Sequence, residues 1–363
     1  MKIKGIQKDL SAQYAEREEV IEGLMVAMIA RQHALLIGPP GTGKSALVSE
    51  LTKRITGANY FQWLLTRFST PEELFGPVSL KELEQGVYKR NTVGKLPEAH
   101  TSFLDEIFKA NSAILNALLT LINERIFYND GAQVQVPLMC LIGSSNEYPE
   151  EGEGLEALFD RFLLRYEVDY IGEDQSFIAM LKGSPASSAN MTLEELFELQ
   201  FFSDTVTIPD EVYDALSKIR RELKDEGIRP SDRRFKQGLS VVRAKAVLAG
   251  RDQAVLEDLM ILKNSLWEKP DQRDKVVKVV RSHAQDAVKT RLEEIEAETK
   301  EILDNLNKNN TTDEAVEATK KLKSLLSELK QMTKKNPARK EIESAISDTQ
   351  KSLSAIASEV LGV

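Results

Sequence analysis

The sequence predicts an α/β fold, in which a mainly parallel sheet lies between helices, followed by two all-helical regions. Three observations lead to this fold class. Residues 1–190 alternate short apolar runs with amphipathic stretches, which is typical of strands joined by helices in a parallel sheet. Residues 191–275 show helical patterning alone, and residues 276–363 carry narrow apolar stripes with charged flanks. Such stripes indicate a helical hairpin, bundle or coiled-coil arm.

The composition is that of an ordinary soluble protein. Hydrophobic residues make up 42% and charged residues 29% of the 363 positions, and no apolar run is long enough to span a membrane. The amino-terminal residues lack the apolar core of a signal peptide, so we expect a cytoplasmic protein. The formal net charge of -9 argues against a dedicated nucleic-acid binder, because phosphate contacts require basic side chains.

The cysteine and the histidines predict neither a reactive thiol nor a metal site. Cys140 is the single cysteine and lies in the apolar run "VPLMCLIGSS", so we expect an inert thiol on a strand. The three histidines are scattered along the chain without the spacing of metal ligands, so we expect no zinc site.

The individual elements follow the apolar runs. The candidate strands are residues 34–38, 61–66, 101–105, 138–145 and 165–170, and two well-patterned helices are residues 19–31 and 111–124. Two segments interrupt the alternation. Residues 78–96 have a Gly-centred turn and predict a hairpin, alone or with a helix, whereas Asn-Asp-Gly within residues 125–137 predicts a second hairpin. A polar Gly/Pro/Ser stretch at residues 181–192 predicts a domain boundary.

The stripes after residue 276 fall into three groups, whose positions alternate steps of three and four residues. They are Ala284, Val288, Leu292, Ile295, Thr299, Ile302 and Leu306; then Ala315, Ala318, Leu322, Leu325 and Leu329; then Ile342, Ala345, Thr349, Leu353 and Ile356. These stripes predict a helical hairpin or a three-helix bundle. The alternative is a solvated helical tail without a specific role.

A phosphate-binding loop is the strongest chemical signal. "GPPGTGKS", residues 38–45, matches G-x-x-x-x-G-K-[ST] between a predicted strand and a predicted helix. Backbone N–H groups of such a loop face phosphates, and the helix amino terminus adds positive potential. Lys44 is expected to reach the β- and γ-phosphates, and Ser45 to bind Mg²⁺. The candidate nucleotide-binding residues are Gly38, Pro39, Pro40, Gly41, Thr42, Gly43, Lys44, Ser45 and Ala46.

Two further strand ends complete this site. "SFLDE", residues 102–106, is an apolar strand that ends in two carboxylates, as a Walker B segment does. Asp105 is expected to hold the Mg²⁺ shell, and Glu106 to polarise the attacking water. The next strand ends in "GSSN", which places Asn146 near the γ-phosphate or the water, although an asparagine there can also cap a turn. No Asn-Lys-x-Asp guanine signature is present, so ATP is favoured over GTP.

From about residue 15 to residue 275 the chain resembles an AAA+ ATPase of the MoxR family, most closely its RavA subgroup. The resemblance rests on "LLIGPPGTGKS", "LLTRFSTPEELFGPVSL", "FLDEIFKANSAILNALLTLINER", "GSSNEYPE", "LEALFDRFLLR" and "PSDRRFK". It implies an AAA+ core, a helical lid over residues 191–275, and ATP hydrolysis with Mg²⁺. It also implies a homo-oligomeric ring, most often a hexamer, that remodels or matures a protein client together with a von Willebrand factor A (vWA) domain partner.

The two predicted insertions fit the same resemblance. Residues 78–96 and 125–137 fall where helix-2-insert proteins carry their insertion and their pre-sensor-1 hairpin. The RavA subgroup is implied to carry a small β-rich module within its carboxy-terminal helices. Here "NKNNTT" leaves no room for that module, so its partner specificity should not transfer.

The resemblance also gives the arginines an interpretation. Arg161 in "FDRF" resembles an arginine finger, which acts on the ATP of a neighbouring subunit; the alternative is an Asp160–Arg161 pair that caps a short helix. Arg233 in "PSDRRFK" resembles the sensor-2 arginine, which would reach over its own subunit's nucleotide, with Arg234 as the alternative and helix capping as the plainer one. Arg165 is left as structural or interfacial. Arg125 in "INER" is a further interface candidate.

Three other functions remain possible from the sequence. A nucleic-acid motor would use the basic residues of the first insertion, which are Lys81, Lys89, Arg90 and Lys95. An ATPase subunit of a metal-chelatase complex would need a partner to hold the metal. A helical scaffold with a vestigial ATPase is opposed by the intact Lys44, Asp105 and Glu106.

Overall fold

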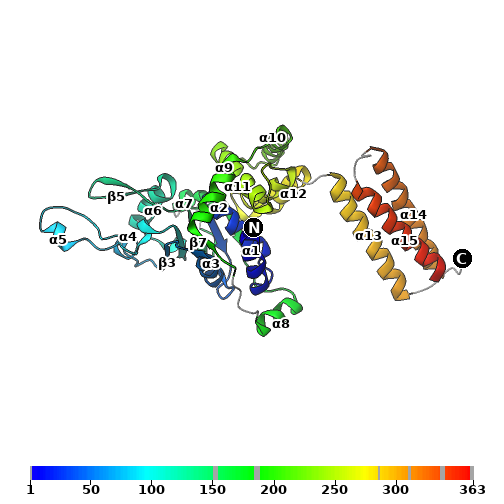
Figure 1. Cartoon of the computed structure of the whole chain (residues 1–363), viewed down its shortest axis with the longest axis horizontal. Helices are drawn as coiled ribbons and strands as arrows, with labels where there is room; N and C mark the ends of the chain where they lie inside the picture. The colour runs from blue at the N-terminus through cyan, green and yellow to red at the C-terminus, as the bar shows by residue number, and fades with distance from the viewer. Residues whose placement is uncertain are drawn as a thin grey trace. The chain divides into compact units, whose positions relative to one another are not determined.

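A computed structural model describes residues 2–149, 154–183, 189–284, 287–309, 312–335 and 340–359. The chain forms two compact units, Met1–Ala284 and Gln285–Val363 (Figure 1). The first unit contains the predicted α/β part and the predicted lid, and the second contains the predicted helical bundle. Among the described residues, no helix has the length and apolarity needed to cross a bilayer.

The sheet of the first unit has five parallel strands in the order β3-β4-β7-β1-β8. They are β1 (Ala34–Ile37), β3 (Tyr60–Leu64), β4 (Thr101–Asp105), β7 (Cys140–Ser145) and β8 (Leu164–Glu167). These are the five strands that the sequence predicts. All residues of β1 and β7 are buried, as expected for central strands of a parallel sheet covered on both faces. Burial raises the pKa of the Cys140 thiol to about 12.

The strand order brings three strand ends to one edge of the sheet. β7 lies between β4 and β1, with Leu104 opposite Gly143 and Ile37 opposite Ser145. Because the strands are parallel, the loops that follow them leave from the same edge. This edge therefore collects the P-loop, the acidic pair and Asn146.

The helices of the first unit, apart from α5 (Leu80–Leu83) and α8 (Asp174–Lys182), which bury no residue, contribute to one continuous hydrophobic core. Those of the α/β part are α1 (Lys2–Gln13), α2 (Glu18–Ala30), α3 (Lys44–Lys53), α4 (Pro71–Phe75), α6 (Ser112–Glu124), α7 (Glu156–Arg161) and α8. Those of the lid are α9 (Leu193–Thr205), α10 (Asp210–Asp225), α11 (Asp232–Ala249) and α12 (Arg273–Ala284), with 3-10 turns at Leu256–Asn264 and Pro270–Gln272. A short parallel pair, β2 (Ile55–Thr56) and β9 (Met191–Thr192), joins the two parts.

The division between the two units differs from the expected start of the carboxy-terminal region at residue 276. α12 buries Val276, Val279, Val280 and Ala284 in the core of the first unit. Ala284 therefore belongs to the lid and not to the first stripe of the bundle. Residues 184–188 of the predicted boundary segment lie outside the described residues.

The two insertions form one projection at one end of the first unit, where Figure 1 shows α5 (Leu80–Leu83) and β5 (Ile126–Asn129). The predicted second hairpin is present, as β5 paired antiparallel with β6 (Ala132–Gln135). The first insertion contains the single turn α5 and an antiparallel bridge between Val78 and Arg90. Asn129 joins the insertions, because its side chain accepts from the Arg90 N–H (2.7 Å) and donates to the Arg90 carbonyl (3.1 Å).

In the part of the second unit that the structure describes there are three helices, α13 (Ala287–Asn309), α14 (Thr312–Lys335) and α15 (Lys340–Glu359). Its core is built from the predicted stripes, namely Ile295, Leu306, Ala318, Leu322, Leu325, Leu329, Ile342 and Ile356. Arg291 on α13 also bonds with Glu328 on α14 through both carboxylate oxygens, at 2.7 and 3.0 Å. The side chains of Val288 and Ala315 lie outside the described residues. A three-helix bundle is thus the form that the stripes take.

Candidate functional site

The loop after β1 has the backbone geometry of a phosphate cradle. Gly41 and Gly43 both have φ of 83°, and nothing lies within 4 Å of a Cβ built on either. Gly38 has φ of 154°, and a Cβ there would lie 2.0 Å from the carbonyl oxygen of Val168. Only glycine fits such conformations and such a close approach without strain. The loop then runs into α3, whose first residue is Lys44.

Lys44 lies inside this loop. Its side-chain nitrogen donates to the carbonyl oxygens of Gly38 (2.5 Å) and Pro39 (2.9 Å), and it lies 3.4 Å from Oδ1 of Asn146. Burial lowers the pKa of Lys44, while the negative charges of Asp105 and Glu106 oppose that shift. The ammonium group therefore lies where three strand ends meet.

Asp105 is fixed at the end of β4 by two hydrogen bonds to one of its oxygens. The hydroxyl of Ser144 and the N–H of Glu106 both donate to Oδ1. No contact between described residues uses Oδ2. A carboxylate held in this way, together with the Ser45 hydroxyl of the loop, is a donor set that suits Mg²⁺.

Glu106 has a strained backbone and an engaged side chain. Its φ and ψ are 52° and 47°, a left-handed conformation that is uncommon for a residue other than glycine and that concentrates at functional sites. Asn146 donates from Nδ2 to Oε1 of Glu106, and Nζ of Lys109 lies 3.2 Å from Oε2. The structure thus brings Lys44, Asp105, Glu106 and Asn146 together, as the sequence predicts.

Two residues of this site were missed by the sequence reasoning. Ser144 lies on β7 two positions before Asn146, which follows the strand, and this period-two spacing was the available signal that it lies near the strand-end carboxylate. Lys109 follows Glu106 by three positions, and only the 3-10 turn Ile107–Lys109 brings it back to that side chain.

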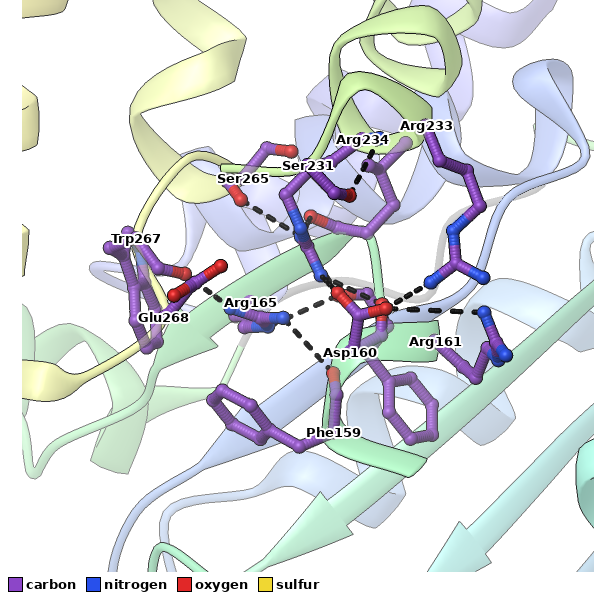
Figure 2. Close-up of polar contacts among 12 residues, drawn as sticks. Phe159, Asp160, Arg161, Arg165, Ser231, Arg233, Arg234, Ser265, Trp267 and Glu268 are labelled. Carbon is purple, nitrogen blue, oxygen red and sulfur yellow. Dashed lines mark hydrogen bonds and ion pairs between the residues drawn. The ribbon is translucent and has the colours of Figure 1, made fainter. Parts of the chain in front are cut away.

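A second cluster lies at the end of α7, around Asp160. Figure 2 shows Arg161, Arg233 and Arg234 directed toward this one carboxylate. Arg233 bonds with Oδ2 and Arg234 donates to Oδ1 at 3.0 Å, whereas Arg161 comes no closer than 3.9 Å from Oδ2. The Asp160–Arg161 ion pair of the alternative is therefore present, but it is long and makes no hydrogen bond. The arginines that hydrogen-bond to Asp160 come from α11.

Two arginines of this cluster are structural. Arg165 is 1% exposed, donates to the carbonyl oxygens of Phe159 and Phe162 (both 3.1 Å) and of Trp267, and lies over the Phe159 ring at 3.9 Å. Arg234 is 2% exposed and donates to the carbonyl oxygens of Asp160 (2.7 Å), Ser265 (2.8 Å) and Leu163 (3.3 Å). Burial lowers the pKa of both guanidinium groups. They satisfy the carbonyls left open where α7 ends.

Arg161 differs from both of them. Among the described residues it makes no hydrogen bond, although its Nε and one terminal nitrogen are buried. Buried donors without an acceptor are rare and costly. Arg233 is also distinct, because its side chain is 45% exposed and its described contact is with Asp160. Neither arginine contacts the P-loop or Glu106 among the described residues.

Arg125, the further interface candidate, is bonded within its own subunit. Its guanidinium donates to the carbonyl oxygens of Arg31 (2.9 Å), Ile122 (3.0 Å) and Met139 (3.3 Å), and it lies beside His33. Burial lowers the pKa of Arg125 to about 10. These contacts show that Arg125 fixes the end of α6 within its own subunit. Because its guanidinium already has these partners, they do not support a role for Arg125 at a subunit interface.

Two of the four basic residues that a nucleic-acid motor would use are bonded within the chain. Arg90 donates to the Gly76 carbonyl (2.8 Å) and to Glu72 (3.1 Å). Lys95 donates to the Glu73 carbonyl (3.0 Å) and lies over the Trp63 ring. Phosphate binding would have to displace these contacts.

Fold and site together define a protein of the AAA+ class, with a P-loop after β1, an acidic pair after β4, a polar residue after β7 and a helical lid. Residues 1–200 match the MoxR domain of the MoxR-vWA-beta-propeller ternary systems, and residues 211–280 match an AAA lid domain. The chain belongs to the MoxR family of AAA+ ATPases, which confirms the family predicted from the sequence.

Two individual relatives and one solved structure are similar to this chain. The chain is 42% identical to the uncharacterized protein MJ0812 of Methanocaldococcus jannaschii over 277 residues, which are 76% of this chain and 74% of that protein. It is 28% identical to the chaperone MoxR1 of Mycobacterium tuberculosis over 158 residues, which are 42% and 41% of the two chains. The crystal structure of a proposed ATPase from Cytophaga hutchinsonii superimposes with a TM-score of 0.63, at 18% identity, over 77% of this chain and 93% of that one. The RavA subgroup is not confirmed by these comparisons and stays a prediction.

Proposed function

We propose that this chain hydrolyses ATP at a site that two neighbouring copies share. The observation that carries the proposal is the separation of its parts. Lys44, Asp105, Glu106 and Asn146 meet at one edge of the sheet, while Arg161 lies in a different cluster with buried donors that no described residue satisfies. A γ-phosphate held by the next subunit is the acceptor that fits such a guanidinium.

The residues of the sheet edge divide the work on the bound nucleotide. The loop N–H groups and Lys44 hold the phosphates, and Glu106 orients the attacking water with the help of Asn146. Ser45 and Asp105 would hold Mg²⁺, which supplies charge neutralisation on the phosphate oxygens. Arg161 approaches from the neighbour, and Arg233 joins it because both lie beside Asp160. This arrangement departs from the expected action of Arg233 within its own subunit.

We further propose a cytoplasmic, hexameric ring that remodels or matures a client protein with a vWA domain partner. The MoxR domain that matches this chain is described from systems that contain MoxR, vWA and β-propeller components, and one relative is described as a chaperone. The client is not specified by either comparison.

The test is steady-state ATPase activity measured over a range of protein concentrations, with Mg²⁺ and with a chelator. We expect Mg²⁺-dependent hydrolysis whose specific activity rises with protein concentration, because a shared site exists only between assembled subunits. Specific activity that stays constant down to a verified monomer would contradict the shared site. Stimulation of hydrolysis by DNA would instead favour the nucleic-acid motor.

A further inference from the structure

The carboxylate of Asp160 serves two different lid arginines with its two oxygens. Oδ1 accepts from Arg234 at 3.0 Å, while Oδ2 bonds with Arg233 and lies 3.9 Å from the guanidinium of Arg161. Both lid arginines stand in the first turn of α11, which begins at Asp232. Asp160 therefore links the last turn of α7 to the first turn of the lid helix (Figure 2).

The two oxygens lie in different environments. Arg234, on the Oδ1 side, is 2% exposed and has three backbone acceptors besides the carboxylate at 3.3 Å or less. Arg233, on the Oδ2 side, is 45% exposed and bonds with Asp160 alone among the described residues. The Oδ1 side thus belongs to the packing of the lid on the core. The Oδ2 side holds an accessible guanidinium that can exchange its partner.

Charge explains why Arg161 and Arg233 need this carboxylate. Two guanidinium groups directed at one place repel each other, and side chains as long as arginine lose rotamer entropy when they are fixed. Asp160 lies beside both and offsets part of that repulsion. With Arg165 and Glu268 counted as well, the cluster holds four guanidinium groups and two carboxylates. This leaves positive charge in excess, which favours an incoming phosphate.

We propose that Asp160 is the positioning residue of the trans-acting arginines: its Oδ2 holds Arg233 beside Arg161 until both meet the phosphates of the neighbouring subunit. The inference rests on the proposed shared site. Asp160 itself does not touch the nucleotide in this scheme, so it is not a catalytic residue. Its effect is exerted on a nucleotide that its own subunit does not bind.

Asp160→Asn is the substitution that separates the two sides. The amide oxygen can still accept from Arg234, whereas the amide NH₂ in place of Oδ2 cannot accept from Arg233 and removes the charge. We expect a folded protein with a lower melting temperature, because buried Arg234 keeps an acceptor but loses its charged partner. ATP binding should be unchanged and kcat lowered about tenfold or more, since hydrogen bonds to charged groups are the stronger ones. Asp232→Asn is the matched control, because Asp232 also stands in the first turn of α11 but pairs with exposed Arg220 of α10 at 3.3 Å.

Mixing variants distinguishes this role from a merely structural one. Asp160→Asn mixed with Glu106→Gln should regain activity, because one variant supplies an intact Glu106 and the other supplies intact arginines. Asp160→Asn mixed with Arg161→Ala should not, because both lack the same half of the shared site. If Arg161→Ala and Glu106→Gln fail to complement each other, the shared site itself is wrong.

Two other results would contradict the role of Asp160 without contradicting the shared site. Suppose that Arg161→Ala and Glu106→Gln complement each other. If Asp160→Asn then keeps the parental kcat, or if it regains activity when mixed with Arg161→Ala, Asp160 does not position the arginines. Where Asp160→Asn fails to fold, Arg233→Gln decides, because it removes the Oδ2 contact and leaves the pair of Asp160 with buried Arg234 in place. A parental kcat for Arg233→Gln would overturn the proposal.

Discussion

Asn146 donates a hydrogen bond to Glu106 while its own amide oxygen lies 3.4 Å from the ammonium group of Lys44. The candidate base is therefore tied to the candidate phosphate-binding lysine through a single side chain. Lys109 holds the other oxygen of Glu106 at 3.2 Å. A γ-phosphate that attracts Lys44 and Asn146 would release one oxygen of Glu106 for the attacking water.

Glu106→Gln should retain nucleotide binding and lose hydrolysis, because an amide cannot accept a proton from the attacking water. Binding is measured by titration with ATP, and hydrolysis by phosphate release. Asn146 keeps a hydrogen-bonding partner in the glutamine oxygen, so the fold of the strand ends should persist. Turnover within about threefold of the parent would show that another residue acts as the base.

Lys44→Ala should abolish nucleotide binding, because the loop loses the one side-chain cation that lies inside it. The matched control is Lys53→Ala, at the exposed end of the same helix, which should bind ATP as the parent does. Isothermal titration with ATP and Mg²⁺ checks both. Tight ATP binding by Lys44→Ala would contradict the assignment of the loop.

Arg161→Ala should bind ATP as well as the parent and hydrolyse it far more slowly. Removal of an arginine finger typically costs about 10³ to 10⁵ in rate. Activity should return when this variant is mixed with Glu106→Gln, in proportion to the mixed interfaces. A mixture that stays inactive despite verified co-assembly would place Arg161 in its own subunit's chemistry.

A chain that ends at Ala284 should remain a folded ATPase. The core of the first unit closes with Val276, Val279, Val280 and Ala284, and every residue of the proposed site lies upstream of it. Basal hydrolysis should survive, whereas engagement of the partner or client should be lost with the three-helix bundle. An insoluble truncation, or one that no longer binds nucleotide, would show that the bundle supports the core.

Stability should fall on the acid side partly through His33. This residue is buried, its Nδ1 accepts from the Leu141 N–H at 2.9 Å, and burial beside Arg125 lowers its pKa well below 6.5. As pH falls below about 6.5, His33 binds a proton in the unfolded chain while it stays neutral in the folded protein, so the free energy of unfolding decreases. Urea unfolding should show a smaller loss between about pH 7.5 and about pH 5.5 for His33→Gln than for the parent. Equal losses would contradict this origin.

The sheet and the nucleotide-site residues could be predicted because their signals are local. A buried strand followed by a phosphate loop, or by two carboxylates, lies within a few residues of sequence, and parallel strands bring such ends together. The partners of Asp160 could not be predicted in this way. Arg161, the neighbour in sequence, forms only a long ion pair with Asp160 at 3.9 Å, and the arginines that hydrogen-bond to Asp160 lie 73 and 74 residues away.

The same limit applies to the end of the first unit. The apolar spacing of Ala284 continues without interruption into that of Leu292, so periodicity alone assigns both to one stripe. Only the packing of α12 against the 3-10 segment Leu256–Asn264 and α10 separates them. Periodicity identifies which face of a helix is buried and does not identify what buries it.

Asn129 joins the two insertions through the main chain of Arg90 and not through its side chain, since it bonds with the N–H and the carbonyl oxygen of that residue. Any amino acid except proline presents the same two groups. Substitution of exposed side chains in residues 78–96 therefore leaves these bonds in place, so such side chains can be redesigned for new clients without separating the insertions. The constraint falls on the second insertion, on Asn129, which both accepts and donates, and on Asp130, whose Oδ1 accepts from the Tyr88 N–H at 3.1 Å.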